Sequence, residues 1–210
     1  MSDLRLPFSH LNLCRNPFGE VPPEQRGRLA IVDIDPYLAR LDEPGFVVEF
    51  LGDSGRGKTT HMRAIWNHFR DAPFLQVPEA AKRVDVPRAA VVFVDEMQFL
   101  PERQRRRLLG QSASFVIGTH DSFTHEYARA GLDFESVPIG GVDEALVEQM
   151  LARRIEWARR GPGPVPTIKD AAVAALIELH GDDLRAIEHH LYEVFQDLEE
   201  ICDVQVHHLC

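Results

Sequence analysis

The stretch that decides the fold is Gly52-Asp53-Ser54-Gly55-Arg56-Gly57-Lys58-Thr59. It fits the pattern G-x-x-x-x-G-K-[ST], which predicts a backbone loop that binds phosphate groups. Glycines allow the tight turn through which several N–H groups point at one anion, and a following helix adds its positive end. Lys58 is placed to reach the β- and γ-phosphates of a nucleotide, and the Thr59 hydroxyl to bind Mg²⁺. We therefore predict that residues 52–59, with Thr60 beside them, bind the phosphate chain of a nucleotide.

The residues on either side predict a strand before the loop and a helix after it. Residues 46–51 form an apolar run interrupted by one glutamate, as expected of a strand. Residues 60–69 predict a helix, because apolar side chains recur on one face. These side chains are Met62, Ile65, Trp66 and Phe69. Strand, loop and helix in this order favour a working phosphate-binding loop over a chance glycine-rich turn.

Two further apolar runs predict buried strands that end in polar residues. Residues 89–94 close on Asp95-Glu96, and residues 114–119 close on Thr119 and His120. Such runs fit parallel strands covered on both faces, and open α/β sheets bind ligands at the carboxyl ends of their strands. With helices predicted at 101–109 and 122–130 and a last strand at 134–139, the sequence predicts an α/β fold, a parallel sheet flanked by helices.

From residue 142 onwards the sequence predicts helices and no strand. The Gly161-Pro162-Gly163-Pro164 segment separates the first helix from the second. Thr167 is predicted to cap the second helix, and an apolar stripe from Leu184 to Ile201 marks the third. We divide the chain into an N-terminal segment, 1–45, a nucleotide-binding core, 46–140, and a small helical lid domain, 141–210.

Composition and charge narrow the classes of partner. Of 210 residues, 44% are hydrophobic and 27% charged, which is ordinary for a globular chain. The net charge of −10 does not indicate a nucleic-acid partner, because neutralising phosphates needs clustered Lys and Arg. One dense basic patch, Arg103 with Arg105, Arg106 and Arg107, leaves open a contact with nucleic acid, a neighbouring subunit or an acidic partner. A solvated helix face is the plain alternative.

The expected location is the cytoplasm, without a membrane partner. No apolar run is long enough to cross a membrane, and residues 1–8 lack a hydrophobic signal core. Three cysteines make no disulfide framework. Four residues of the tail have side chains that can bind metal, but their spacing fits no standard zinc pattern, so a frayed tail is favoured. These are Cys202, His207, His208 and Cys210.

Asp95 and Glu96 are candidates for chemistry on a nucleotide. Transfer of a phosphoryl group to water needs a metal ion, an oriented water molecule and neutralisation of charge at the γ-phosphate. Asp95, at the end of a buried strand, is placed for the Mg²⁺ shell. Glu96, one residue on, can accept a proton from the attacking water. The alternative is that the two residues merely begin a loop.

On these residues the chain resembles AAA+ type P-loop ATPases, over roughly residues 12–200. The resemblance rests on the loop at 52–59, on residues 92–96 and on two further segments. Residues 117–120 resemble the sensor-one strand of the family, which implies that Thr119 touches the γ-phosphate or the water. Gly181-Asp182-Asp183-Leu184-Arg185 resembles the sensor-two motif of the initiator or transposition-regulator-like branch, which implies that Arg185 reaches the phosphates.

The resemblance implies ATP and Mg²⁺ as cofactors, and a homo-oligomer or a protein partner. It implies that residues 16–19 lie near the adenine. It also implies that Arg129 occupies about the place of the arginine finger, although an arginine at a helix C-terminus also suits the helix dipole. The stretch between the loop and Asp95 is short for the family, which disfavours an unfoldase. The catalytic residues implied are Lys58, Glu96, Thr119 and Arg185.

The favoured hypothesis is an ATP-hydrolysing switch that regulates or remodels a protein or nucleoprotein partner. The alternative is a nucleotide-binding adaptor with little or no turnover. An ABC-type ATPase would carry its signature before the acidic strand, whereas residues 109–112 follow that strand. A GTPase would need an Asn-Lys-x-Asp guanine-binding motif, which the sequence lacks. The helical lid disfavours a small-molecule kinase.

Overall fold

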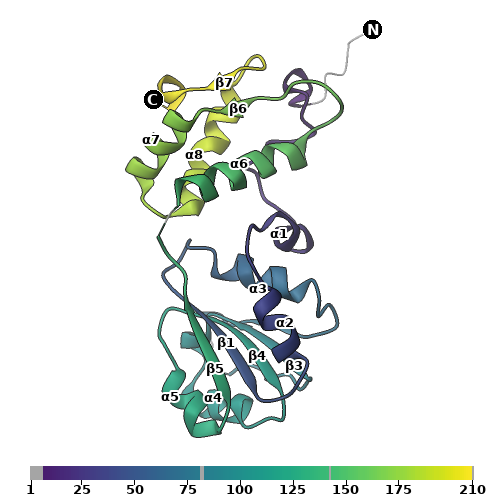
Figure 1. The fold of residues 1–210 in the computed structure, drawn as a ribbon, viewed down its shortest axis with the longest axis vertical. Helices are drawn as coiled ribbons and strands as arrows, with labels where there is room; N and C mark the ends of the chain where they lie inside the picture. The colour runs from purple at the N-terminus through teal and green to yellow at the C-terminus, as the bar shows by residue number, and fades with distance from the viewer. Residues whose placement is uncertain (1–6, 81–82, 142, 210) are drawn as a thin grey trace. The chain divides into compact units, whose positions relative to one another are not determined.

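The computed structural model of the chain describes residues 7–80, 83–141 and 143–209. They form two compact units (Figure 1). The helical unit combines the described residues of Met1–Pro22 with those of Gly141–Cys210, and the sheet unit takes in those of Pro23–Gly140. The segment 1–45 is thereby divided. Leu11 and Leu13 lie in the core of the helical unit, whereas Tyr37 and Leu41 lie in a core of the sheet unit.

The sheet unit is built on five parallel strands in the order β2-β3-β4-β1-β5. The three central strands are almost wholly buried, which explains why their sequences are mostly apolar. The parallel sheet predicted from the sequence is confirmed. Its strands are β1 (Phe46–Leu51), β2 (Phe74–Gln76), β3 (Val91–Asp95), β4 (Ser114–Thr119) and β5 (Asp133–Pro138).

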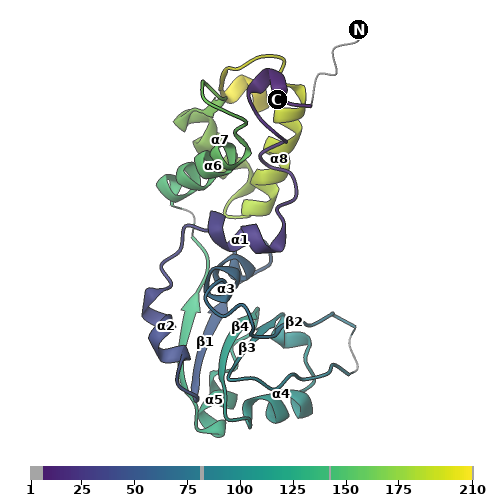
Figure 2. The ribbon, with the colours of Figure 1, turned by 90° about the vertical axis from the view of Figure 1, so that its right-hand side faces the viewer.

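Helices cover both faces of this sheet. On one face Met62 and Ile65 of α3 pack in one cluster with Phe93 of β3. On the other face Leu108 of α4 and Tyr127 of α5 pack in a cluster with side chains of β1, β3 and β4. Figure 2 shows α2 and α4 on opposite sides of the strands. The helices of this unit are α1 (Pro23–Leu29), α2 (Asp35–Leu41), α3 (Lys58–Trp66), α4 (Glu102–Leu109) and α5 (Thr124–Ala130).

The helical unit contains α6 (Glu144–Ala158), α7 (Asp170–His180) and α8 (Leu184–Asp197), which share one apolar core. The prediction that it has no strand was wrong. Thr167–Ile168 forms β6, which pairs in parallel with β7, Asp203–Val204. Two-residue strands are too short to give a periodic pattern. Among the described residues, none of the helices has the length and apolar character needed to cross a membrane.

Three finer predictions also need correction. Thr167 does not cap α7: it lies in β6, where its hydroxyl donates to the carboxylate of Asp203, and Lys169 stands at the N-cap. The apolar stripe of the third helix does not reach Ile201, because α8 ends at Asp197 and Ile201 is 37% exposed. Similarly, α3 ends at Trp66 rather than Phe69.

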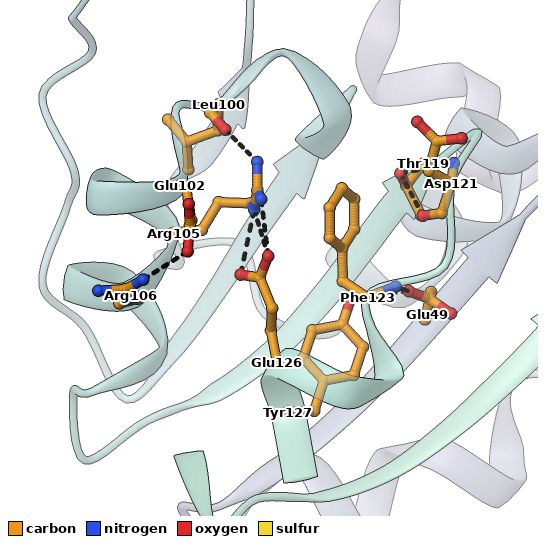
Figure 3. A network of polar contacts seen from close by, with 10 residues as sticks. All are labelled: Glu49, Leu100, Glu102, Arg105, Arg106, Thr119, Asp121, Phe123, Glu126 and Tyr127. Carbon is orange, nitrogen blue, oxygen red and sulfur yellow. Dashed lines mark hydrogen bonds and ion pairs between the residues drawn. The ribbon is translucent and has the colours of Figure 1, made fainter. Parts of the chain in front are cut away.

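A buried glutamate ties β1 to α5. Glu49 is fully buried, and its Oε1 accepts hydrogen bonds from the backbone N–H of Phe123 at 2.9 Å and the Tyr127 hydroxyl at 2.8 Å (Figure 3). Its Oε2 accepts from the hydroxyls of Ser122 at 3.2 Å and Ser136 at 2.5 Å. Burial, and after it the charge of Glu49, raises the pKa of the Tyr127 hydroxyl far above its usual value, so this group stays a donor. The strand that leads into the predicted phosphate loop is thus fixed to its neighbours.

An ion pair joins α4 to α5 and removes one arginine from the predicted basic patch. Arg105 Nη2 lies 2.6 Å from Glu126 Oε1, and its Nη1 donates to the carbonyl of Leu100 at 2.6 Å (Figure 3). The Arg105 and Glu126 side chains are 14% and 9% exposed, so Arg105 supports the fold instead of offering charge to a partner. Arg106 pairs with Glu102 on its own helix. The prediction of a four-arginine patch is corrected accordingly.

Glu49→Gln is expected to destabilise the sheet unit by about 2–3 kcal/mol, because an amide nitrogen would face donors that now meet a carboxylate oxygen. Urea unfolding followed by Trp66 fluorescence in a Trp157→Phe background measures this change. Glu135→Gln on β5 is the matched control, since its ion pair with Arg40 is part-exposed and should contribute less than about 1 kcal/mol. Equal effects of the two substitutions would contradict a stabilising role for the Glu49 network.

Candidate nucleotide site

The loop predicted to bind phosphate joins β1 to α3. Gly55 and Gly57 have φ angles of 85° and 99°, a backbone region in which other residues are strained. Gly57 is the N-cap of α3, and α3 begins at Lys58. The first N–H groups of this helix therefore adjoin the loop, an arrangement that favours a bound anion.

Lys58 closes back over the loop that precedes it. Its Nζ donates to the carbonyl of Gly52 at 2.7 Å and to that of Asp53 at 2.8 Å, and the residue is only 4% exposed. Phosphate oxygens are stronger acceptors for an ammonium group than neutral carbonyls, because they are charged. A nucleotide phosphate in the loop would therefore compete with the two carbonyls for the hydrogen bonds that the Lys58 ammonium group donates.

Thr59 and Asp95, the two residues predicted to hold Mg²⁺, are brought together. The Thr59 hydroxyl donates to Asp95 Oδ2 at 2.7 Å, although one residue lies on α3 and the other ends β3. Burial raises the pKa of the Asp95 carboxyl, and the hydrogen bond from Thr59 opposes this change. A buried carboxylate beside a hydroxyl provides oxygen ligands that suit a divalent cation. The positive charge of the cation would offset the cost of burying the negative carboxylate.

Gly118 makes room for this pair, a role that we did not predict from the sequence. A Cβ atom at Gly118 would lie 2.6 Å from Asp95 Oδ1 and 2.6 Å from Met62 Sδ. Any side chain here would displace the carboxylate. The signal was present, because a glycine inside a buried strand often marks a close approach of another group.

Glu96 follows β3 in the left-handed conformation, with φ 60° and ψ 45°. Its Oε2 accepts a hydrogen bond from Gln98 Nε2 at 2.5 Å and lies 3.5 Å from His120 Nε2. Gln98 and His120 were not predicted to contact Glu96. Gln98 belongs to no motif, and although His120 ends the segment that resembles sensor one, an α-helix and a strand separate the two residues in the sequence.

Thr119 is the last residue of β4, the strand between β1 and β3, and it is fully buried. Its hydroxyl lies 2.9 Å from the carbonyl of Asp121 and 3.2 Å from Gln98 Oε1, with the hydroxyl as donor. The strand order thus places Thr119 between the strand that enters the loop and the strand that ends in Asp95.

The remaining predicted residues belong to other helices and segments than those that form this cluster. Arg185 belongs to the helical unit and is exposed in the first turn of α8. Arg129 is exposed in the last turn of α5. Residues 16–19 belong to the helical unit, where the Asn16 side-chain amide donates to the carbonyl of Tyr192 at 2.9 Å and Arg154 donates to the carbonyls of residues 17 and 19.

The tail carries no metal centre in the part of the chain that the structure describes. Within that part, no group of three or more His, Cys, Asp or Glu residues is arranged to hold a metal ion. His207 and His208 lie in a short 3-10 helix with ring centroids 4.0 Å apart. Cys210, the fourth tail residue whose side chain can bind metal, lies outside the described residues.

The fold is similar to two kinds of solved structure. Cdc6p from Pyrobaculum aerophilum superposes with a TM-score of 0.53 at 15% identity, over 85% of this chain and 63% of that chain. The RuvB Holliday junction branch migration motor from Thermotoga maritima gives a TM-score of 0.59 at 16% identity, over 91% of this chain and 67% of that chain. The likeness confirms the predicted fold class, a parallel sheet flanked by helices and followed by a helical domain.

The comparisons also set limits. The chain spans less than two thirds of the Cdc6p structure and about two thirds of RuvB. No protein-family model matches the chain, and no curated protein sequence matches it. At these identities the likeness concerns the fold.

Proposed function

We propose that the chain binds ATP with Mg²⁺ and hydrolyses it, as an AAA+-like switch. The observation that carries this proposal is the contact between Thr59 and Asp95 at the end of a loop of phosphate-binding sequence, with Glu96 next to it. Thr59 and Asp95 would hold the Mg²⁺ ion, which would neutralise charge on the β- and γ-phosphates. Glu96 would accept the proton of the attacking water.

The other residues are given roles by their positions. Lys58 would donate its hydrogen bonds to phosphate oxygens in place of the carbonyls of the loop. Thr119, at the end of the middle strand, would contact the γ-phosphate or the attacking water. Within this proposal residues 46–140 are the nucleotide core and 141–210 the lid, with residues 16–19 on the adenine side. The phosphate chain would be bound by Gly52, Asp53, Ser54, Gly55, Arg56, Gly57, Lys58, Thr59 and Thr60.

We infer that the switch acts on a protein or nucleoprotein partner, in the manner of the initiator or transposition-regulator-like branch. The likeness to a Holliday junction branch migration motor supports a nucleoprotein partner, while the net charge of −10 favours contact with nucleic acid through another protein. A homo-oligomer would place the exposed Arg129 where it can serve the site of a neighbour. A cytoplasmic location accords with this role.

Steady-state phosphate release separates this proposal from its alternative, a nucleotide-binding adaptor. The switch requires turnover of Mg·ATP that a partner or self-assembly changes. Binding of Mg·ATP without turnover, alone and with every candidate partner, would contradict the switch and leave the adaptor.

Arg185→Ala is expected to lower the preference for ATP over ADP by about fivefold or more, the lower end of typical coupling between two sites. Gly181 ends α7 with φ 62°, and Arg185 follows at the start of α8. Its acidic neighbours have other partners: Glu188 lies 3.1 Å from Arg154, and Asp182 accepts from the backbone of Gly141. In this proposal Arg185 would be the cation of the helical unit that senses the γ-phosphate.

Equilibrium binding of both nucleotides measures this preference. Arg160→Ala, another exposed arginine of the helical unit, is the control and should leave the ratio unchanged. Equal weakening of ATP and ADP by Arg185→Ala would argue against the sensing role.

A further inference from the structure

Gln98 links the candidate base to the end of the middle strand. It lies on a short 3-10 helix, Met97–Phe99, directly after Glu96. Its Nε2 donates to Glu96 Oε2 at 2.5 Å. Its Oε1 accepts from the Thr119 hydroxyl at 3.2 Å and from the backbone N–H of His120 at 3.3 Å. One side-chain amide therefore contacts the candidate base, Glu96, and two residues at the carboxyl end of β4, Thr119 and His120.

The chemistry of these partners fixes how the amide must face. A carboxylate only accepts hydrogen bonds, and a backbone N–H only donates them. Nε2 must therefore face Glu96 and Oε1 must face His120, because the reverse orientation would oppose donor to donor and acceptor to acceptor. Glutamate has the same shape but no donor, and methionine has the same length but neither group. Only an amide satisfies both sides.

Gln98 holds one oxygen of Glu96 and leaves the other. Among the described residues, Glu96 Oε1 has no hydrogen-bond partner, so it can accept from water. The left-handed backbone of Glu96 is costly for a residue with a side chain and persists only where neighbours hold it. The contacts of Gln98 and the nearby His120 ring are such a restraint.

We propose that Gln98 is a positioning residue that holds Glu96 for proton transfer and couples it to Thr119 and His120 at the end of β4. This inference rests on the proposed function, since Glu96 acts as a base only if the chain hydrolyses ATP. A γ-phosphate that changes the contacts of Thr119 would, through the one amide, change the setting of Glu96.

Gln98→Met is expected to lower kcat by about tenfold or more, because orientation of a reacting group contributes at least this much. The KM for ATP and the affinity for Mg·ATP should change by less than about twofold, since the amide does not touch the loop. Gln98→Glu should lose turnover as well, although it preserves the shape. Gln111→Met is the matched control: it removes a hydrogen bond to the carbonyl of Pro87 at the other end of β4. An unchanged kcat in Gln98→Met would overturn the proposal.

A measurement without nucleotide tests the link itself. In ¹⁵N NMR spectra, the Gln98 side-chain amide is assigned by its loss in Gln98→Met. Its resonances should shift in Glu96→Gln and in Thr119→Val, but not in Glu102→Gln, an exposed control. Shifts in neither of the first two would overturn the link whatever the turnover. Shifts in both, in a chain that binds Mg·ATP without hydrolysing it, would overturn the catalytic role and the ATPase proposal while leaving the contact.

Discussion

Lys58→Ala is expected to lower the affinity for Mg·ATP by about a hundredfold or more, which is about 2.7 kcal/mol or more. The ammonium of Lys58 contributes charge-assisted hydrogen bonds to the phosphates that no neutral side chain can replace. In the structure its Nζ donates to the carbonyls of Gly52 and Asp53, which belong to the loop itself. Isothermal titration with Mg·ATP measures the loss, and circular dichroism checks the fold.

Lys169→Ala is the matched control for this substitution. Lys169 pairs with Asp203 in the helical unit and is half exposed. Removing its charge should leave the affinity for Mg·ATP unchanged. A folded Lys58→Ala variant with the affinity of the wild type would refute the assignment of residues 52–59 as the phosphate loop.

Glu96→Gln is expected to lower turnover by about a hundredfold or more while the affinity for Mg·ATP stays the same. Glutamine keeps an oxygen that can accept from Gln98, so the loop after β3 should be preserved. It cannot accept a proton from water, because an amide is not a base. Phosphate release under saturating Mg·ATP, beside the binding isotherm, separates the two effects.

Glu102→Gln serves as the control for Glu96→Gln. Glu102 is an exposed carboxylate that pairs with Arg106 in the first turn of α4, so its loss should leave turnover unchanged. Full turnover in Glu96→Gln would mean that another group accepts the proton.

The sequence predicts the fold wherever a segment carries its own pattern. The apolar runs that became β1, β3 and β4 are buried on both faces, so their composition reports their position. The loop at 52–59 is recognisable because its glycines and its lysine are required by local backbone geometry and charge. The boundaries of α3 and α5 shifted by a few residues, as helix ends generally do.

What the sequence could not predict depends on contacts between distant segments. Glu49 looks like a lone charge in an apolar strand, and the donors that satisfy it come from residues 122–136. In the sequence Arg105 belongs to a basic patch, whereas in the structure it forms an ion pair with Glu126. Gln98 has no motif to mark it, and its link to Glu96 and β4 depends on the order of strands in the sheet. The same holds for β6 and β7, which exist only because the two segments pair.

Calorimetric titration of the wild-type chain with ATP, in Mg²⁺ and again in EDTA, tests the central claim most directly. The claim is that residues 52–59, with Thr59 and Asp95, form one site for Mg·ATP on each chain. The account predicts one ATP bound per chain, with an affinity at least about tenfold higher in Mg²⁺, because the ion would join Thr59 and Asp95 to the phosphates. Absence of binding in either condition, or binding to which Mg²⁺ makes no difference, would contradict it.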